Sequence, residues 1–339
     1  MQLLVTGGAG FIGSNFVRHA LNRWPDCRLT VLDKLTYSGN RANLADCEAD
    51  GRMRFIKGDI CDPVAVAGAI RNCSAVINFA AETHVDRSIR DSSDFVRTDI
   101  EGTRVLLEAA RVNQVERYIQ VSTDEVYGEI AHPARSSEHD VLRPRSPYAA
   151  SKAGGDLMAL AYHTTHGVPA LIGRASNNFG PYQFPEKLIP LFITNALQEA
   201  PLPLYGDGRQ ERDWLAVEDH CVALSLLLER GEPGQIYNIG TGVERPNIDV
   251  AERILNLVGR PPSLIRHVTD RPGHDRRYAL SCDKIRALGW SPRQDFDTAL
   301  AETVQWYRSN DAWWRACRGD EFAAYYAQQY DQRLQDARA

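Results

Sequence analysis

Short apolar runs alternate with segments of helical pattern through the first half of the chain. The runs are rich in Val, Ile and Leu, as are strands that lie buried on both faces of a parallel sheet. They occupy residues 3–5, 29–32, 54–56, 75–79 and 118–121. The helical pattern after the first run includes Phe16, Val17 and Leu21. This alternation predicts an α/β fold in which a doubly wound parallel sheet is covered by helices on both faces.

The pattern changes after about residue 175, where Pro and Gly become frequent and aromatic and basic residues lie among them. Long loops of this kind usually carry a binding site on a rigid scaffold. We therefore expect residues 1–175 to form the sheet domain. Residues 176–339 should form mainly a smaller, mixed substrate-binding lobe, with some segments returning to the first domain. From Trp306 to Leu334 the pattern is helical and rich in aromatic residues.

Charge and cysteine content narrow the classes of function. The 39 Lys and Arg residues against 44 Asp and Glu residues give a net charge of −5, which disfavours a broad nucleic-acid-binding surface. The seven cysteines include no CxxC pair, so neither a disulfide framework nor a metal site is predicted. No apolar run approaches the ~20 residues of a membrane span, and the first strand begins at Gln2 without room for a signal peptide ahead of it. We expect a soluble cytoplasmic protein.

A glycine-rich segment, TGGAGFIG at residues 6–13, joins the first predicted strand to the first predicted helix. Gly7, Gly10 and Gly13 permit a tight turn, close approach of the backbone to a pyrophosphate, and close helix–strand packing. The N-terminus of the helix adds free N–H donors and a partial positive charge. The spacing is GxxGxxG, and a glycine-rich turn by itself is a weak signal. Its position directly after the first strand favours a dinucleotide site on a Rossmann domain.

An acidic residue, Asp33, closes the second predicted strand, 20 residues beyond the last glycine. A carboxylate at this position hydrogen-bonds the adenosine ribose and repels a 2′-phosphate, so NAD is favoured over NADP. Lys34 and Arg41 lie nearby and act against that preference. Asp59 and Ile60 end the third strand, where an adenine contact is expected, although Asp59 fits a plain helix cap equally well.

A second motif, SPYAASK at residues 146–152, has the composition of a helix start, with Ser146 as the N-cap and Pro147 at the first helical position. Tyr148 and Lys152 follow with i,i+4 spacing, which places both side chains on one helix face. Because a nearby ammonium stabilises phenolate, we expect Lys152 to lower the pKa of Tyr148 from ~10 toward neutrality. Tyr148 could then act as a general base on a sugar hydroxyl. YxxxK is common by chance and gains its weight from the dinucleotide loop ahead of it.

Two adjacent acids, Asp124 and Glu125, follow the strand that ends at Val121. This places them at the carboxyl edge of the sheet, where ligands bind in open α/β folds. Paired carboxylates in a cleft can have their pKa values pushed apart, which gives one acid and one base. The same pair also fits the acidic first turn of a helix. Their location and pairing together favour catalysis.

The chain resembles the extended short-chain dehydrogenase/reductases in TGGAGFIG, in the Asp33 position and in YAASK. Within that family it resembles the dTDP-glucose 4,6-dehydratases in STDEVYG at residues 122–128 and AAETHVD at residues 80–86. The similarity continues in NNFGPYQFPEKLIP and DRPGHD, and reaches about Trp306. The Thr-Asp-Glu triplet is its most specific part, because related decarboxylases and GDP-mannose dehydratases usually lack Asp in the middle position.

That resemblance implies conversion of dTDP-glucose to dTDP-4-keto-6-deoxyglucose and water by a homodimeric enzyme that keeps NAD bound. Tyr148 would take the proton of the C4 hydroxyl while NAD⁺ accepts the C4 hydride, and Thr123 would hydrogen-bond the C4 oxygen. Glu125 would remove H5, Asp124 would protonate the departing 6-hydroxyl, and the hydride would return to C6. The net reaction is a dehydration, so the implied enzyme is a carbon–oxygen lyase of deoxysugar biosynthesis.

The expected ligand contacts fall into two sets. Taken with the loop residues above, the expected NAD contacts are Gly7, Gly10, Phe11, Ile12, Gly13, Asp33, Lys34, Leu35, Thr36, Asp59, Ile60, Ala80, Ala81, Thr98, Tyr148, Lys152 and Asn178. The nucleotide-sugar contacts implied by the resemblance are His84, Thr123, Asn177, Lys187, Leu188, Tyr205, Arg212, Asn247, Arg271 and His274. Lys187, Arg212 and Arg271 suit a diphosphate chemically, although each also fits a solvated surface charge.

Two kinds of alternative stay open. A UDP-glucose 4,6-dehydratase or another nucleotide-sugar enzyme of the same superfamily would share most of these residues. An epimerase needs Tyr148 and Lys152 but no acid pair, so Asp124 and Glu125 argue against it. A catalytically silent, NAD-binding regulatory protein would be expected to lack the tyrosine, the lysine or the acids, and all are present.

Overall fold

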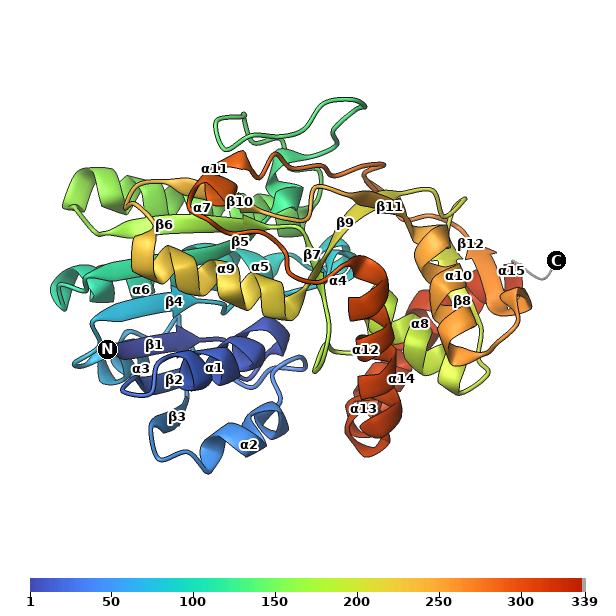
Figure 1. The fold of residues 1–339 in the computed structure, drawn as a ribbon, viewed down its shortest axis with the longest axis horizontal. Helices are drawn as coiled ribbons and strands as arrows, with labels where there is room; N and C mark the ends of the chain where they lie inside the picture. Colours follow the sequence, from blue (N-terminus) through green and yellow to red (C-terminus); the bar gives the residue numbers. More distant parts are fainter. Residues whose placement is uncertain (337–339) are drawn as a thin grey trace.

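The computed structural model describes residues 1–336, and its centre is a seven-stranded parallel sheet (Figure 1). The first strand lies inside the sheet, where Val5 pairs with both Val31 and Ile77. In spatial order the strands are β10 (Ile236–Ile239), β6 (Ala170–Ala175), β5 (Arg117–Thr123), β4 (Ala75–Asn78), β1 (Gln2–Thr6), β2 (Arg28–Asp33) and β3 (Met53–Lys57). The predicted doubly wound parallel sheet is confirmed.

Two hydrophobic layers cover the sheet because side chains alternate between its faces. Leu3 and Val5 point into a core with α1 and α9, whereas Leu4 points into a core with α3, α6 and α7. The bounds of these covering helices are α1 (Phe11–Arg23), α3 (Pro63–Ile70), α6 (Thr103–Val112), α7 (Pro147–His166) and α9 (Val217–Arg230). Burial on both faces explains why the strands read as continuous apolar runs.

A smaller lobe carries its own hydrophobic core and two short sheets. One sheet has the order β11 (Glu244–Pro246), β9 (Glu211–Ala216), β7 (Asn177–Phe179), and the other pairs β12 (Ile265–Val268) with β8 (Leu202–Tyr205). Its helices are α8 (Leu188–Leu197), α10 (Asn247–Val258), α12 (Phe296–Ser309), α13 (Asp311–Cys317), α14 (Asp320–Tyr326) and α15 (Gln332–Asp336). The predicted helical, aromatic-rich stretch near the C-terminus is confirmed, and a π-helical turn, η5 (Ala327–Asp331), links α14 to α15.

Short elements connect these units, and several of them carry side chains of the site described below. They are η1 (Arg41–Leu44), α2 (Ala45–Glu48), α4 (Val85–Arg90), α5 (Ser93–Val96), the π-helical η2 (Arg97–Gly102), the 3₁₀ turn η3 (Asp124–Tyr127), η4 (Pro262–Leu264) and α11 (Asp283–Ala287).

The chain crosses between the two units more than once. The strand β10 pairs with β6 in the central sheet, and α9 packs beside α1, although both come after residue 175. We propose the division at about residue 175, with these later segments belonging to the sheet domain.

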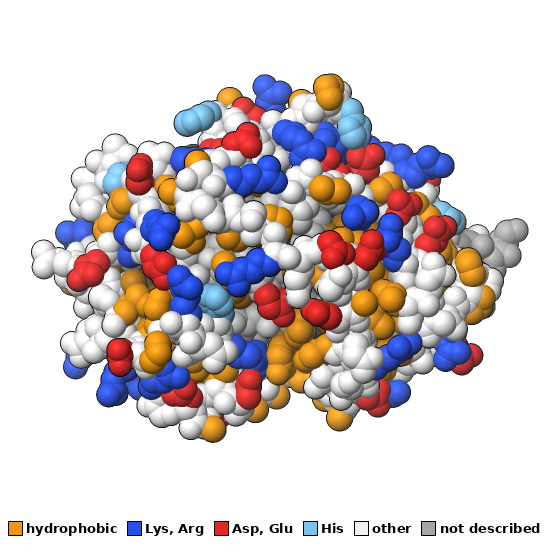
Figure 2. Space-filling view, in the orientation of Figure 1, with side chains coloured by type: hydrophobic (Ala, Val, Ile, Leu, Met, Phe, Trp, Pro, Cys, Tyr) orange, Lys and Arg blue, Asp and Glu red, His pale blue; other side chains and the backbone are white. Residues whose placement is uncertain are grey.

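The visible surface carries mixed charge, and the described residues contain no disulfide, membrane-crossing helix or metal-binding group. Figure 2 shows acidic and basic side chains interspersed over the visible face. All seven cysteines are free thiols. Within residues 1–336, no helix has the length and apolarity to cross a membrane. The same described residues contain no group of three or more His, Cys, Asp or Glu side chains arranged to hold a metal ion.

Candidate active site

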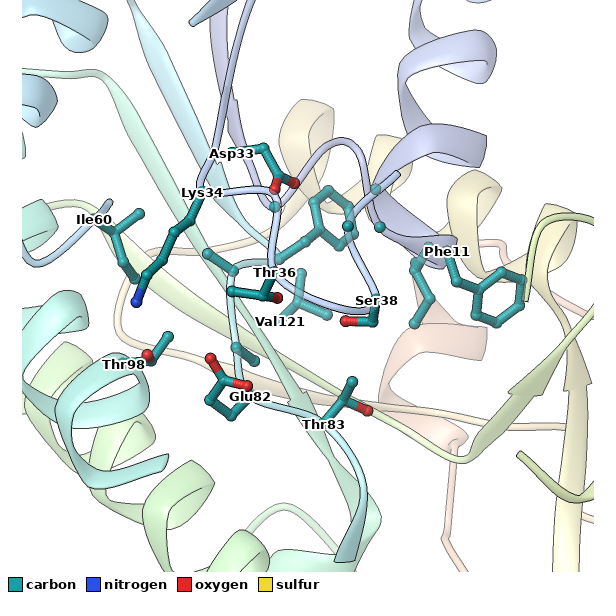
Figure 3. Close-up of a pocket in the computed structure, with 18 of the residues that line it drawn as sticks. Phe11, Asp33, Lys34, Thr36, Ser38, Ile60, Glu82, Thr83, Thr98 and Val121 are labelled. Atoms are coloured by element: carbon teal, nitrogen blue, oxygen red, sulfur yellow. The ribbon is translucent and has the colours of Figure 1, made fainter. Parts of the chain in front are cut away.

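A cavity lies at the carboxyl ends of the central strands, and the glycine loop forms one wall (Figure 3). Gly7 adopts φ +67°, and a Cβ on Gly13 would lie 2.3 Å from the Gly7 carbonyl oxygen, so both positions require glycine. A Cβ on Gly10 would meet only that same oxygen, at 3.2 Å. The helix α1 begins after Gly10 with no side-chain cap and no acid in its first turn. These free amides fit a pyrophosphate.

Asp33 lies at the end of β2 on the wall of this cavity. Its two carboxylate oxygens accept hydrogen bonds from the backbone amides of Ala9 (2.9 Å) and Leu35 (2.8 Å). Burial raises the pKa of Asp33, and the two amide hydrogen bonds oppose that rise. Each oxygen keeps lone-pair capacity for a further donor, so the carboxylate fits the ribose hydroxyls of NAD. Figure 3 shows Asp33 at one end of the labelled residues and Glu82 and Thr83 at the other.

The helix-cap interpretation of Asp59 is wrong. Asp62, not Asp59, caps α3 by accepting from the amide of Val64. Asp59 instead lines the cavity, forms an ion pair of 3.1 Å with Lys34, and accepts from the amide of Cys61 at 2.9 Å.

Most residues expected to contact NAD line this cavity, but Leu35 and Asn178 are not among the lining residues. Leu35 sits at φ +58° and uses its amide to hold Asp33. The side chain of Asn178 is engaged elsewhere, by His220 Nδ1 at 2.9 Å and the Ser176 carbonyl oxygen at 2.9 Å. The lining residues that the motifs place in the cavity are Gly7, Gly10, Phe11, Ile12, Gly13, Asp33, Lys34, Thr36, Asp59, Ile60, Ala80, Ala81, Thr98, Tyr148 and Lys152.

A second cavity lies beside the first, and Glu186 and Lys187 line both. Every residue expected to contact the nucleotide sugar lines it except Thr123. The three cations Lys187, Arg212 and Arg271 belong to its wall, so the surface-charge interpretation of them is wrong. The lining residues expected from the sequence are His84, Asn177, Lys187, Leu188, Tyr205, Arg212, Asn247, Arg271 and His274.

Backbone and side-chain contacts hold Arg212 and Arg271 in place. Arg212 donates to the carbonyl oxygens of Glu211 (2.8 Å) and Asp275 (2.9 Å), and its guanidinium lies over the Tyr278 ring at 4.2 Å. The Arg271 guanidinium donates to Asp86 at 3.3 Å, while its Nε is buried without a partner. His84 has φ +105°, a conformation that a non-glycine residue adopts only under strain. A cavity with fixed cations fits a diphosphate.

Sequence reasoning missed several lining residues. In the first cavity the missed charged groups are Glu82 and Glu186, and in the second they include Asp86. All three lie inside the motifs that carried the family resemblance, so those motifs could have indicated them as site residues. Tyr278 and Tyr330 also line the second cavity, and nothing local in the sequence marks Tyr330.

The reacting side chains meet where the two cavities adjoin. Thr123 ends β5 and caps the turn η3 by accepting from the amide of Glu125 at 3.3 Å, and it donates to Asp124 at 3.2 Å. Glu125 faces the second cavity, whereas Tyr148 and Lys152 on α7 face the first. The predicted helix start is confirmed, since Ser146 accepts from the amide of Ala149.

The surroundings separate the two adjacent acids. Burial raises the pKa of Asp124 well above its usual value, the neighbouring Glu125 raises it further, and one carboxyl oxygen is buried without a partner. Burial also raises the pKa of Glu125, but Arg271, Arg212 and Lys187 counteract that effect. Asp124 is therefore the more readily protonated of the two, and Glu125 ionises more readily.

The structure contradicts the predicted lowering of the Tyr148 pKa. Burial raises the pKa of Tyr148 well above 10, and the carboxyl groups of Glu125, Asp99 and Asp124 add to the rise, against a small opposing effect of Thr123. The Lys152 ammonium donates to the Val121 carbonyl oxygen at 2.8 Å. Spacing on a helix thus placed the pair correctly, but burial and the carboxyl groups that come from other elements raise the pKa of Tyr148.

Comparison with known proteins agrees with the motifs. Residues 4–303 match the family model described as GDP-mannose 4,6 dehydratase. A dTDP-glucose 4,6-dehydratase of Streptomyces niveus is 51% identical over 328 residues, which are 95% of this chain and 97% of that protein. DesIV, a dTDP-glucose 4,6-dehydratase from Streptomyces venezuelae solved with NAD bound, is 51% identical with a TM-score of 0.91, covering 94% of this chain and 100% of that one. A Thermus thermophilus UDP-glucose 4-epimerase in complex with NAD is 33% identical with a TM-score of 0.85, covering 91% and 100%. The family resemblance is confirmed.

The raised pKa of Glu82 predicts how the stability of the protein depends on pH. Burial, helped by Asp94 and Asp99, raises its pKa from 4.5 to about 7. Since the unfolded chain loses this proton at a lower pH than the folded protein, Glu82 lowers the stability as the pH rises from about 4.5 to about 7. Glu82→Gln should therefore raise the melting temperature by a few degrees at about pH 8 and much less at about pH 5. Thermal unfolding at both pH values, with the exposed Glu116→Gln as control, measures this. An equal rise at both pH values would show that the carboxyl group does not titrate as described.

Proposed function

The chain belongs to the GDP-mannose 4,6 dehydratase family, and from that premise we propose that it dehydrates dTDP-glucose to dTDP-4-keto-6-deoxyglucose with NAD as cofactor. The observation that supports this most strongly is the acid pair close to Tyr148. Asp124 is buried, Glu125 lines the nucleotide-sugar cavity, and Tyr148 lines the cofactor cavity. The enzyme is an NAD-dependent dehydratase, a carbon–oxygen lyase of deoxysugar biosynthesis.

The first cavity would hold the cofactor. Its glycine loop and the free amides of α1 suit the pyrophosphate, and Asp33 suits the adenosine ribose. Bound NAD would supply a hydride acceptor for C4 in its oxidised form and a hydride donor for C6 in its reduced form, and the positive ring of the oxidised form would favour the phenolate of Tyr148.

The chain's own residues move the protons. Tyr148 takes the proton of the C4 hydroxyl, and Thr123, which ends the neighbouring strand, hydrogen-bonds the C4 oxygen. Lys152, one turn further along α7, is fixed to the carbonyl of Val121 and faces the same cavity. The C4 ketone formed in this way acidifies the proton on C5, which makes elimination across C5 and C6 accessible.

Elimination then needs one base and one acid. Glu125 removes the C5 proton, because the three neighbouring cations favour its ionised form. Asp124 is the more readily protonated acid and donates its proton to the departing 6-hydroxyl, since burial and the charge of Glu125 raise its pKa. The buried oxygen of Asp124 that has no hydrogen-bond partner among residues 1–336 supports this role.

Other functions fit the site less well. A UDP-glucose 4,6-dehydratase would use the same reacting groups, and the roughly 50% identity to dTDP-glucose 4,6-dehydratases favours the thymidine nucleotide. The reaction of an epimerase would not use Asp124 and Glu125. A silent regulatory protein would not need the buried, electrostatically separated acids.

We also propose that the protein forms a homodimer and is cytoplasmic. Leu157 on α7 and Val96 on the adjoining α5 are large apolar side chains that are more than half exposed, and they support a homodimer built over these helices. Seven free cysteines support a reducing, cytoplasmic environment.

Removing the hydroxyl of Tyr148 tests the base. In Tyr148→Phe, product formation should fall by ~10²–10⁴-fold, the usual contribution of a general base, with folding and bound NAD unchanged. Steady-state rates, melting temperature and the NAD(H) released on denaturation measure this. Tyr162→Phe is a matched control, since Tyr162 lies on the same helix and outside both cavities. Near-normal turnover of Tyr148→Phe would assign the base to another residue.

A leaving-group substitution separates the two acids. Asp124→Asn and Glu125→Gln should both slow dehydration of dTDP-glucose by ~10²-fold or more. When fluoride replaces the 6-hydroxyl, the leaving group departs without a proton. The Asp124→Asn defect should then shrink, and the Glu125→Gln defect should persist. Rates with both substrates, followed by product analysis, measure the effect. If both variants respond alike, the division into acid and base is incorrect.

A further inference from the structure

The C-terminal segment from α14 to η5 packs against the outer side of the nucleotide-sugar cavity. Tyr330 lines the cavity, and Gln329 next to it is buried with 7% of its surface exposed. Tyr325 contacts His84 in a T-shaped arrangement with ring centroids 5.6 Å apart. More than 100 residues of sequence separate this segment from His84 and Tyr205, the cavity residues that it contacts.

Gln329 begins a chain of hydrogen bonds that leads into the cavity. Its Nε2 donates to the Tyr205 hydroxyl at 2.6 Å, and that hydroxyl donates to Asp86 Oδ2 at 3.0 Å. The other oxygen of Asp86 accepts from the Arg271 guanidinium at 3.3 Å. Tyr205, Asp86 and Arg271 all line the cavity, whereas Gln329 does not.

The neighbouring charged groups fix the donor and the acceptor of each hydrogen bond in this series. Arg90 donates to Gln329 Oε1 at 2.5 Å, and a guanidinium can only donate, so the amide must turn its NH₂ toward Tyr205. Tyr205 has a single proton, and that proton is needed by Asp86. Although burial acts to raise it, the pKa of Asp86 is lowered by His84, Arg271 and Tyr205, so Asp86 is a carboxylate that can only accept.

We propose that Gln329 is a positioning residue for the nucleoside-diphosphate end of the substrate, acting through Tyr205, Asp86 and Arg271. This inference rests on the proposed function of the same cavity. Gln329 orders the single proton of Tyr205, which keeps Asp86 paired and leaves the Arg271 guanidinium fixed at the cavity wall. The C-terminal segment is therefore part of the substrate site although it contacts no reacting atom.

Two substitutions of nearly equal size distinguish this role from packing. Gln329→Met keeps the volume and removes the donor. Gln329→Glu keeps the shape but replaces the donor with a second acceptor, so two carboxylates compete for the one proton of Tyr205. A packing role predicts that both variants resemble the wild type. The positioning role predicts that both weaken binding and that Gln329→Glu is at least as damaging as Gln329→Met.

Gln328→Ala is the matched control. Gln328 accepts from the same Arg90 guanidinium at 2.6 Å, but it is exposed and does not line the cavity. It should therefore leave nucleotide binding unchanged. The double variant Tyr205→Phe with Gln329→Met should bind no more weakly than Tyr205→Phe alone, because both act on one interaction.

The measurement is calorimetric binding of dTDP to the full-length protein with its bound NAD, together with KM and kcat for dTDP-glucose. Gln329→Met should raise the Kd for dTDP and the KM by about five- to thirty-fold, the range produced by a lost buried hydrogen bond. The kcat, the NAD content and the melting temperature should stay close to those of the wild type. Unchanged Kd and KM in both Gln329 variants would overturn this inference alone. A wild-type protein that does not bind dTDP would overturn the proposed substrate and this inference with it.

Discussion

The site depends on the burial of two adjacent carboxyl groups whose charges cannot both be accommodated. Asp124 and Glu125 lie side by side in a low-dielectric environment, where two negative charges so close together are strongly disfavoured. Arg271, Arg212 and Lys187 counteract the rise in the pKa of Glu125, while Arg212 counteracts that of Asp124, which Glu125 raises further. Asp124 is therefore the more readily protonated acid and Glu125 the more readily ionised one. The proposed elimination requires this division, because one group must remove a proton while the other supplies one.

The fold holds the reacting groups in register through a buried polar network. Arg174 on β6 is nearly inaccessible to solvent, pairs with Asp156 of α7 at 2.8 Å, and donates to the Tyr127 hydroxyl at 2.8 Å. Tyr127 belongs to the turn that carries the acid pair, and it donates to Asn238 of β10 at 2.8 Å. This network connects the helix of Tyr148, the turn of Asp124 and the late strand β10, so the carboxyl edge of the sheet becomes one rigid surface.

Local patterns were sufficient to predict the sheet, the glycine loop and the helix that starts at Ser146, because turns, caps and buried strands have local chemical requirements. Local patterns also predicted Asp33 beside the glycine loop and the acid pair that follows β5. What failed depended on distant residues. Burial and the carboxyl groups of Glu125, Asp99 and Asp124, which come from other elements, raise the pKa of Tyr148. Tyr330 reaches the cavity, and Gln329 reaches Tyr205, only through the packing of the C-terminal helices, which no local pattern records.

The central claim is that this site dehydrates a thymidine-diphosphate sugar. The most direct measurement offers dTDP-glucose, UDP-glucose and GDP-mannose separately to the purified protein and identifies the products by mass and by NMR. The account predicts that dTDP-glucose is converted most efficiently, with loss of one water and formation of a 4-keto-6-deoxy sugar. An epimerised sugar of unchanged mass, or dehydration of UDP-glucose or GDP-mannose in preference to dTDP-glucose, would contradict it.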